Sequence, residues 1–412
     1  MRVLVLSTVF PNALQPTFGV FVAERIRRVA RHCDVSVVAP VPWFPGNNLI
    51  RPQWAGVPAM EEAEGFRVYH PRILCAPRYA KWLDGALYAA SLFPVLARLR
   101  RPFPFDLIDA HFAYPDGLAA ALLGAVFRVP VVITLRGSLV RLRHHPLHRP
   151  QIRWALRRAT RVLAVSESLK QVAEELGVPA GHIRVIPNGV DAGRFVPRER
   201  AEARRALGLP QDRTIIISVG GLNEGKGHHH VVALLPELAR RHPDLLYVIV
   251  GGERPGDSSR PLIESLAARH DVSHRVRLVG ARPHDEVPLW LAAADLFCLA
   301  TRSEGWANVL LESLACGTPV VSTRVGGNAE IVTHEGLGIL VPAADDGALA
   351  AALLEGLGRR WDRQLLVAHA RAHSWDSAVR GVLDEFDRVL GRGTAAGEPL
   401  PGLASPEARG RR

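Results

Sequence analysis

Residues 295–319 read DLFCLATRSEGWANVLLESLACGTP, a succession of strand, loop and helix that decides the fold. The run 295–300 has the length and apolarity of a buried strand. Gly305 breaks that strand, Asn308 is an acceptable helix N-cap, and 309–311 begins an apolar helix face. A buried strand that leads through a short loop into a helix is typical of a parallel α/β sheet.

Two carboxylates flank this predicted helix start. Glu304 falls in the loop, and Glu312 lies about one turn inside the helix. The free N–H groups of Asn308, Val309 and Leu310 would point out between the two acids and offer a site for an anion. This arrangement suits a ligand that carries both a phosphate and sugar hydroxyls. A solvated helix with two surface glutamates explains the segment equally well, so both interpretations stay open here.

The same alternation of short apolar runs and helical patterns continues along the chain and predicts parallel sheets flanked by helices. The first half predicts strands at 2–7, 34–39, 106–110, 130–135, 161–165 and 183–186. The helices expected between them are 20–31, 84–100, 117–127, 150–158 and 167–176. A second series of strands is expected at 214–219, 245–250, 275–279, 295–299, 319–322 and 338–341. The sequence therefore predicts two Rossmann-like halves.

A punctuating segment, Pro187-Asn188-Gly189-Val190-Asp191, separates the two series. We place a first domain at residues 1–190 and a second at 191–375. Apolar residues at helical spacing predict one more helix at 376–390. The tail 391–412 is rich in Gly, Pro, Ala and Arg and is predicted to be disordered.

The composition is that of a globular α/β protein and limits the choice of partners. The chain has 412 residues, 48% of them hydrophobic and 22% charged, with a net charge of +11. A polyanionic partner must therefore be considered, whether nucleic acid, an anionic membrane surface or a phosphorylated substrate. Most of the charge is arginine scattered along helix faces, with no patch of basic and interleaved aromatic residues, and we expect no nucleic-acid partner.

Cysteine spacing and hydropathy favour a cytoplasmic protein without a metal site. The four cysteines show no CxxC or CxxH spacing, which indicates neither a zinc site nor a disulfide framework. Residues 1–7 read as a first strand and not as a signal peptide. No apolar run reaches the roughly 18 residues that span a bilayer, so we expect a soluble or peripheral protein.

Two stretches could bind the anionic inner face of a membrane. The stretch 83–101 is apolar and closes on Arg98, Arg100 and Arg101, and the stretch 141–149 is rich in Arg and His. Basic amphipathic segments bind anionic lipid surfaces. A domain helix and a solvated loop explain the same patterns, and the sequence leaves both interpretations open.

A glycine-rich turn opens the second half, where residues 220–227 read GGLNEGKG. Glycines such as Gly220 let a phosphate approach the backbone, and Lys226 supplies a positive charge. The spacing nearly matches a Walker A motif, but Gly227 stands where a Ser or Thr would hold magnesium. A P-loop ATPase is therefore disfavoured. A solvent-facing lysine at a helix start is the simpler alternative to a phosphate site.

Histidines occur at two places that invite a functional interpretation. The triplet 228–230 cannot converge on one metal ion, because successive helical residues point about 100° apart, and we expect surface histidines. His111 follows a strand and lies at the carboxyl edge, where open α/β sheets bind ligands. Gly19 ends a long loop after the first strand and would approach the same edge, but no GxGxxG supports a dinucleotide. A lone histidine is more often structural than catalytic, and both interpretations of His111 stay open.

Taken together, these elements resemble a retaining family-4 glycosyltransferase of the GT-B fold, over about residues 1 to 390. The matching segments, in order, are FGVF at 18–21, DAH at 109–111, TLRG at 134–137, VIPNGVD at 185–191 with Arg194 and Phe195, VGGL at 219–222 with Lys226 and Gly227, SEGWANVLLE at 303–312, and GTPVV at 317–321 with Gly326, Gly327 and Glu330. A Glu-x7-Glu pair alone is a weak signal, whereas this ordered set is specific.

The resemblance implies two Rossmann-like domains that face each other across a cleft, with the helix 376–390 crossing back onto the first domain. The first domain would bind the acceptor and the second the nucleotide sugar. Glu304 would face the donor sugar, Glu312 would bond the ribose hydroxyls, and Lys226 would hold the pyrophosphate. The other donor-binding positions that it implies are Gly19, Gly220, Asn308, Val309 and Leu310. His111 would lie beside the reacting face of the sugar, which makes it a catalytic candidate with Lys226 and Glu304.

One position departs from the family pattern, which usually has an arginine five residues before the lysine. Gly221 stands there instead. Either Arg136 or Arg302 compensates, or the leaving group is stabilised less. Because each charge-assisted contact contributes about 1.5–3 kcal/mol, activity should survive the change.

The implied reaction is sugar transfer from a nucleotide sugar to a polysaccharide or lipid-linked glycan, with retention. No DxD-like cluster follows a strand, so we expect no metal and no cofactor apart from the donor substrate. Lys226 and the helix dipole would stabilise the departing diphosphate. Two alternatives remain: a nucleotide-sugar epimerase of the same fold, which needs no acceptor, and a basic nucleic-acid-binding protein.

Overall fold

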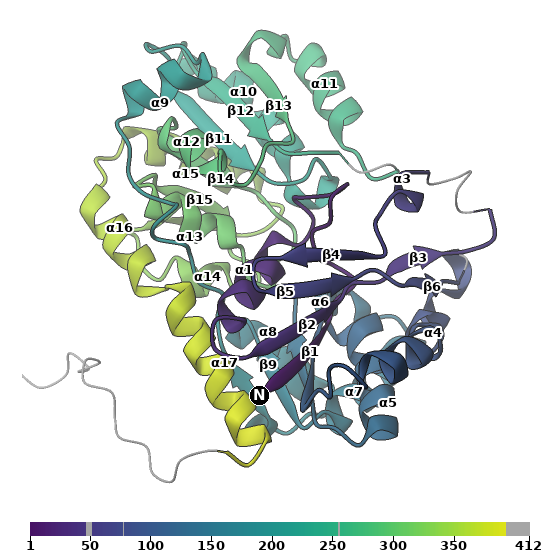
Figure 1. Cartoon of the computed structure of the whole chain (residues 1–412). Helices are drawn as coiled ribbons and strands as arrows, with labels where there is room; N and C mark the ends of the chain where they lie inside the picture. Colours follow the sequence, from purple (N-terminus) through teal and green to yellow (C-terminus); the bar gives the residue numbers. More distant parts are fainter. Residues whose placement is uncertain (47–51, 77, 254–255, 393–412) are drawn as a thin grey trace, which may run out of the picture.

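The computed structural model describes residues 1–46, 52–76, 78–253 and 256–392, and its main feature is a pair of parallel sheets (Figure 1). The first sheet has eight strands in the order β10-β9-β8-β7-β1-β2-β5-β4. The second has six strands in the order β13-β12-β11-β14-β15-β16. Helices flank both sheets, which confirms the two Rossmann-like halves predicted from the sequence.

Six strands of the first sheet are parallel, and all but the edge strand β10 are nearly fully buried, as their apolar sequences predict. They are β1 (Arg2–Leu6), β2 (Asp34–Val38), β7 (Leu107–His111), β8 (Val131–Leu135), β9 (Arg161–Ala164) and β10 (Ile183–Val185). The helices and turns of this domain are α1 (Val20–Val29), α3 (Pro52–Ala55), η1 (Arg78–Leu83), α4 (Asp84–Leu99), η2 (Ala113–Gly117), α5 (Leu118–Phe127), α6 (Ser138–Leu142), α7 (Arg149–Arg158), α8 (Glu167–Glu175) and η3 (Ala180–His182).

Four short strands between α1 and α4 were not predicted from the sequence. They are β3 (Val41–Trp43), β4 (Met60–Ala63), β5 (Phe66–Tyr69) and β6 (Arg72–Leu74). β5 extends the sheet beside β2 in parallel, and β4 adds an antiparallel edge, while β3 and β6 pair separately. Each has only three or four residues, and β4, β5 and β6 also contain charged side chains, so no apolar run long enough for a strand marks them.

The second domain begins at α9 (Arg200–Leu207) and follows the predicted alternation. Its strands are β11 (Ile215–Val219), β12 (Leu246–Val250), β13 (Val276–Gly280), β14 (Leu296–Leu299), β15 (Val320–Thr323) and β16 (Gly338–Val341). Its helices and turns are η4 (Glu224–Lys226), α10 (His228–Arg241), α11 (Arg260–Arg269), η5 (Ser273–Arg275), α12 (Val287–Ala292), α13 (Asn308–Ala315), α14 (Asn328–Ile331), α15 (Asp346–Gly358) and α16 (Arg363–Ala372).

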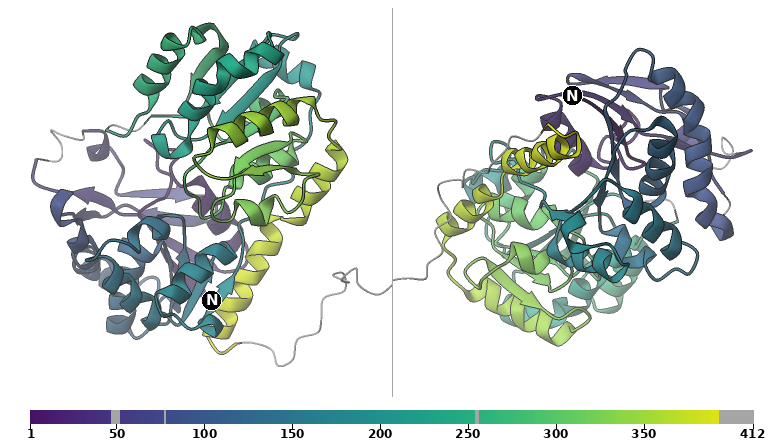
Figure 2. Two further views of the ribbon diagram at one scale, coloured as in Figure 1. Left: turned by 180° about the vertical axis from the view of Figure 1, so that it is seen from behind. Right: turned by 90° about the horizontal axis from the view of Figure 1, so that it is seen from below.

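The last helix, α17 (Trp375–Val389), leaves the second domain and packs on the first (Figure 2). Its residues Val379, Val382 and Phe386, spaced by three and four, join the hydrophobic cluster around Val22 of α1. Glu385 of α17 also pairs with an arginine of β9 at 2.6 Å. The predicted disordered tail lies outside the described residues from 393 onward.

The stretch 83–101, one of the two predicted to bind a membrane, forms a helix that is partly packed against the first domain. α4 buries Tyr88, Leu92 and Leu96 against the first domain, whereas Phe93 on its other face is 46% exposed. Every helix among the described residues is too short or too polar to cross a bilayer.

Candidate active site

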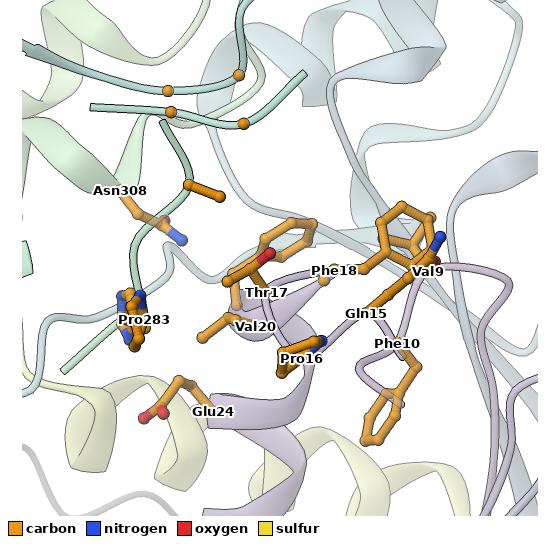
Figure 3. A pocket seen from close by; sticks show the side chains of 18 of the residues that line it. Val9, Phe10, Gln15, Pro16, Thr17, Phe18, Val20, Glu24, Pro283 and Asn308 are labelled. Carbon is orange, nitrogen blue, oxygen red and sulfur yellow. The ribbon is translucent and has the colours of Figure 1, made fainter. Parts of the chain in front are cut away.

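A cavity of about 1310 Å³ lies between the two domains, at the carboxyl ends of both sheets. Open parallel sheets place their loops, and so their ligands, at this edge. The first-domain wall comes largely from the segment between β1 and α1, and the second-domain wall from the loops after β11, β12, β13 and β14. Figure 3 shows side chains of the first domain, among them Thr17, Val20 and Glu24, opposite Pro283 and Asn308 of the second.

Most of the residues that the sequence singled out line this one cavity. They are Gly19, Gly220, Lys226, Glu304, Asn308, Val309 and Glu312. His111 and Leu310 do not line it. Positions that are far apart in the chain therefore converge, because the segments that carry them follow the carboxyl ends of β1, β11 and β14.

The loop 220–227 packs closely against the end of β14, and this explains its last glycine. Gly227 has φ +73°, and a Cβ there would lie 1.8 Å from the carbonyl oxygen of Ala300. A serine or threonine, as in a Walker A motif, cannot be accommodated at this position. The glycine thus serves strand–loop packing, while Gly220, on the cavity wall, leaves backbone open to a ligand.

Lys226 and Glu304 form an ion pair on the cavity wall, with Nζ 2.5 Å from Oε1. The Thr301 hydroxyl donates to the same carboxylate oxygen at 3.2 Å. The side chains of Lys226 and Glu304 are 30% and 13% exposed. Lys226 is therefore not the solvent-facing lysine of the simpler alternative. A cation held beside a carboxylate on a glycine-rich wall is suited to exchange partners with an anionic ligand.

The start of α13 differs from the prediction by one residue. Asn308 is the first helical residue and not the N-cap, and its side-chain oxygen accepts from Asn188 Nδ2 at 3.0 Å. The N–H of Leu310 donates to the carbonyl of Ala307 at 3.0 Å, and the Leu310 side chain is fully buried. The expected free N–H at Leu310 is therefore wrong, because the first turn is tightened. In the described residues no hydrogen bond occupies the N–H groups of Asn308 and Val309.

His111 lies one layer behind the cavity wall and not on it. Its Nε2 is 3.2 Å from Asp109 Oδ2, and its Nδ1 accepts from Arg136 Nη2 at 3.1 Å. Burial lowers the pKa of His111 to about 4, despite the opposing charge of Asp109. Arg136 in turn donates to Asn188 at 3.0 Å and lies 4.9 Å from the centre of the Phe21 ring, which lines the cavity. A buried chain of hydrogen bonds thus runs from His111 to Asn308.

Neither arginine proposed to compensate for Gly221 reaches the cavity. Arg136 belongs to the buried chain, where desolvation lowers its pKa to about 9, and Arg302 is absent from the cavity wall. The arginine among the lining residues is Arg282, in the loop after β13. Sequence analysis missed it, although its position at the carboxyl end of a strand was available as a signal.

His284, two residues further on, was also missed. It lines the cavity, its Nε2 is 3.2 Å from Glu312 Oε1, and its Nδ1 is 2.9 Å from Arg194 Nη1. Glu312 itself is 14% exposed. The proposed ribose anchor is therefore held by a side chain of a neighbouring loop.

The prediction of surface histidines at 228–230 is wrong for His228. It is 1% exposed and lies 3.4 Å from the hydroxyl of buried Tyr247, and burial lowers its pKa to about 4. Its place directly after Gly227 directs the ring inward under β12. Among the described residues, no three His, Cys, Asp or Glu side chains are grouped as metal ligands, and the four cysteines are free thiols.

Known families match almost the whole of this architecture. The family described as Glycosyltransferase Family 4 matches residues 18–194, and Glycosyl transferases group 1 matches residues 199–372. A Bacillus subtilis protein named as a teichuronic acid biosynthesis glycosyltransferase, TuaC, is 31% identical over 369 residues, which cover 86% of this chain and 88% of that protein.

Solved structures show the same fold at lower identity. Sucrose-phosphate synthase from Thermosynechococcus elongatus has a TM-score of 0.76 at 20% identity, covering 95% of this chain and 99% of that one. HepE from Anabaena, in complex with UDP, has a TM-score of 0.72 at 18% identity, covering 94% and 100%. The fold and the matched family models define a glycosyltransferase of the GT-B type. Within that class, the chain belongs to the family-4 glycosyltransferases.

Proposed function

We propose that this enzyme moves a sugar, with retention, from a nucleotide sugar to a polysaccharide or lipid-linked glycan. The observation that carries this proposal is the Lys226–Glu304 pair, set on the same cavity wall as the start of α13 and Glu312. A cation and a helix N-terminus can bind a diphosphate, and the two carboxylates can accept hydrogen bonds from the hydroxyls of two sugars. The complex of HepE with UDP supports UDP as the first nucleotide to test.

In this proposal each lining residue has a separate task. Lys226 and the N–H groups of Asn308 and Val309 hold the diphosphate, beside the open backbone of Gly220. Glu312 accepts from the ribose hydroxyls, and Glu304 turns from the lysine to the donor sugar. Gly19 closes the phosphate side from the first domain.

His111 takes an indirect part in this mechanism. Because it lies behind the wall, its proposed role is to hold Arg136 and, through Asn188, the first residue of α13. The buried charges would thus fix the direction in which the helix N–H groups point.

The chemistry follows from where charge develops. As the glycosidic bond to the diphosphate breaks, negative charge grows on the leaving oxygen, and preorganised Lys226 and the α13 N–H groups stabilise it. The acceptor hydroxyl attacks from the same face and gives its proton to the departing phosphate. We propose that this proceeds without a metal ion, with these groups neutralising the leaving charge.

The acceptor side of the cavity favours a lipid-linked acceptor over a phosphorylated sugar. First-domain lining residues include Phe10, Leu14, Pro42 and Trp54, and no lysine or arginine is among the lining residues that the structure describes in that domain. A sugar with a phosphate placed against this wall would lack a counter-charge there, whereas an apolar tail would gain from burial. The polysaccharide assignment has independent support from the name of the TuaC relative.

We further propose that the enzyme binds the inner, anionic face of a membrane through 83–101 and 141–149. Leu83, Phe93 and Leu147 are exposed by 36%, 46% and 46%. Residues 141–158 contain six arginines and no acid. Exposed apolar side chains beside a basic stretch are the combination that interfacial binding needs. Co-sedimentation with vesicles containing about one third phosphatidylserine, but not with neutral vesicles, is the expected result; equal recovery from both would refute it.

One assay separates the proposed function from its alternatives. The enzyme is incubated with UDP-sugars, GDP-sugars and ADP-sugars, with and without a lipid-linked glycan acceptor. We expect release of nucleoside diphosphate that depends on the acceptor and persists in EDTA. An altered sugar nucleotide formed without acceptor would instead identify an epimerase. Complete loss in EDTA that magnesium restores would contradict the metal-independent mechanism.

A further inference from the structure

Four side chains from separate segments form a continuous ionic chain across the interdomain cavity. Glu24 of α1 lies 3.2 Å from Arg194 Nη1, in the segment that connects the domains. The same Nη1 is 2.9 Å from Nδ1 of His284, and His284 Nε2 is 3.2 Å from Oε1 of Glu312. One end of the chain is therefore on the acceptor domain, and the other is the carboxylate proposed to hold the ribose.

The middle of this chain fixes the hydrogen positions of the imidazole. Arginine can only donate, so its contact with Nδ1 requires His284 to accept there and to carry its hydrogen on Nε2. That hydrogen then points at Glu312 Oε1 and leaves Oε2 for a ligand. Orientation of a functional ligand by a second hydrogen bond on a histidine ring is a general device.

The first-domain end is held firmly by further ion pairs. Arg28 lies 2.6 Å from Glu24 and also 2.8 Å from Asp191, at the start of the connecting segment. Glu24 is only 5% exposed, and although burial alone would raise its pKa, the arginines around it lower it. Glu24 therefore stays charged and keeps Arg194 in place near neutral pH.

We propose that Arg194 and His284 are positioning residues that orient Glu312 for the donor ribose and couple nucleotide binding to the arrangement of the two domains. This inference rests on the proposed function, because it assigns the ribose to Glu312. A carboxylate held in one orientation loses less entropy when it binds a ligand. By linkage, a nucleotide that uses the oriented Glu312 stabilises the domain arrangement in which Glu24 reaches Arg194.

The chain should respond to pH through His284. The groups that face it are Glu312 of α13, Arg194 of the connecting segment and Glu24 of α1, with the Phe195 ring 5.4 Å away. Burial lowers the pKa of His284, but the hydrogen bond and charge of Glu312 outweigh this, so that the pKa is raised. Protonation places a hydrogen on Nδ1 opposite the Arg194 guanidinium. Acid therefore breaks the link to the first domain while the pair with Glu312 remains.

Arg194 is the best residue to change, because it does not line the cavity and its loss removes no direct ligand contact. UDP affinity is measured by calorimetry for the wild type, Arg194→Met, Arg194→Lys and His284→Gln. We expect about 10-fold weaker binding for Arg194→Met and partial recovery in Arg194→Lys, which keeps one donor for His284 Nδ1. Asp346→Asn is the matched control. It breaks a histidine–carboxylate pair, His230 Nδ1 to Asp346 Oδ1 at 2.8 Å, that lies outside the cavity, and it should bind UDP like the wild type.

A double-mutant cycle decides whether the effect passes through Glu312. In a Glu312→Gln background, Arg194→Met should change UDP affinity less than twofold. The ratio of the UDP affinity of the wild type to that of Arg194→Met should also decrease as the pH falls from about 9 to about 6. Titration of the phosphate affects both proteins equally and cancels in this ratio.

Additive effects in the cycle, or an Arg194→Met variant that folds and binds UDP like the wild type, would overturn the inference. If Arg194→Met alone fails to fold, His284→Gln and Arg194→Lys replace it in the cycle with Glu312→Gln. Both must then show the same loss of effect in the Glu312→Gln background. A wild type that binds none of UDP, GDP and ADP would overturn the proposed function itself, and with it the coupling.

Discussion

The two walls of the interdomain cavity are built from similar sheet edges but have opposite chemistry. The second-domain wall carries Lys226, Arg282, Glu304 and Glu312 on loops that follow successive strands. Among the residues that the structure describes, the first-domain wall carries mainly Phe, Leu, Pro, Val and Trp side chains, with Glu24 and His70 as its titratable groups. The difference supports our proposal that charge recognition belongs to one domain, while the other selects its substrate by shape and apolar contact.

The walls also differ in how their loops are held. On the second domain, glycines allow backbone to lie against backbone, as where Gly227 meets Ala300. On the first domain, buried Asp116 accepts from the N–H and hydroxyl of Thr8 at 2.5 and 2.9 Å and so anchors the loop after β1. One loop is therefore fixed by close packing and the other by a carboxylate.

The largest expected effect comes from removing the charge of the second wall. Lys226→Ala should lower kcat/KM by about 10²- to 10³-fold, because the developing charge on the diphosphate loses its cation. Initial rates with the best nucleotide sugar provide the measurement. Lys170→Ala is the matched control, since Lys170 forms an equally short pair with Glu167, at 2.6 Å, away from the cavity. A near-normal rate for Lys226→Ala would contradict the proposal that Lys226 binds the diphosphate.

A second variant tests the close packing of the glycine loop. Gly227→Ala forces a Cβ against the Ala300 carbonyl and should lower the free energy of unfolding by more than 2 kcal/mol, about twice the backbone strain alone. Chemical denaturation measures this change. Gly208→Ala, also at positive φ but with nothing within 4 Å, isolates the strain and should cost about 1 kcal/mol. Equal losses in both variants would show that packing at Ala300 does not matter.

A third variant separates acceptor from donor recognition. Leu14 lines the first wall and is 47% exposed, so Leu14→Ser should raise the acceptor KM about 3- to 10-fold and leave UDP affinity unchanged. Leu262→Ser, at a 36% exposed leucine of α11, is the control. If UDP affinity falls and the acceptor KM does not, the division of labour between the walls is wrong.

A fourth test concerns pH and the anchor of the first wall. Burial raises the pKa of Asp116 to about 7, against the hydrogen bonds from Thr8. The folded state thus binds a proton that the unfolded state releases near pH 4, and the contribution of Asp116 to stability falls as the pH rises from about 4 to about 7. The difference in unfolding free energy between the wild type and Asp116→Asn should decrease over that range. A constant or rising difference would contradict the raised pKa.

Much of the fold could be predicted from the sequence, because the buried parallel strands are continuous apolar runs. The family resemblance implied that Gly19 faces Lys226, Glu304 and Glu312 across a cleft. The rule that parallel strands end at one edge accounts only for the three residues of the second domain. The strands between Val41 and Leu74 could not be predicted, since each has only three or four residues and three of the four contain charged side chains.

Side-chain contacts between distant segments also lay beyond the sequence. Nothing in the spacing indicates that Lys226 meets Glu304, that His284 holds Glu312, or that the first turn of α13 uses the N–H of Leu310. These contacts depend on how the loops of the second domain fold against one another. His111 was placed at the correct sheet edge, but its burial depends on Phe21 and Arg136, which come from other elements.

A crystal structure of the complex with UDP tests the central claim most directly. The diphosphate should lie within hydrogen-bond distance of Lys226 Nζ and the N–H groups of Asn308 and Val309, with the ribose hydroxyls on Glu312 Oε2. Glu304 should have left the lysine, while His284 still holds Oε1 of Glu312. A diphosphate bound on the first-domain wall, or a ribose that does not touch Glu312, would contradict the account.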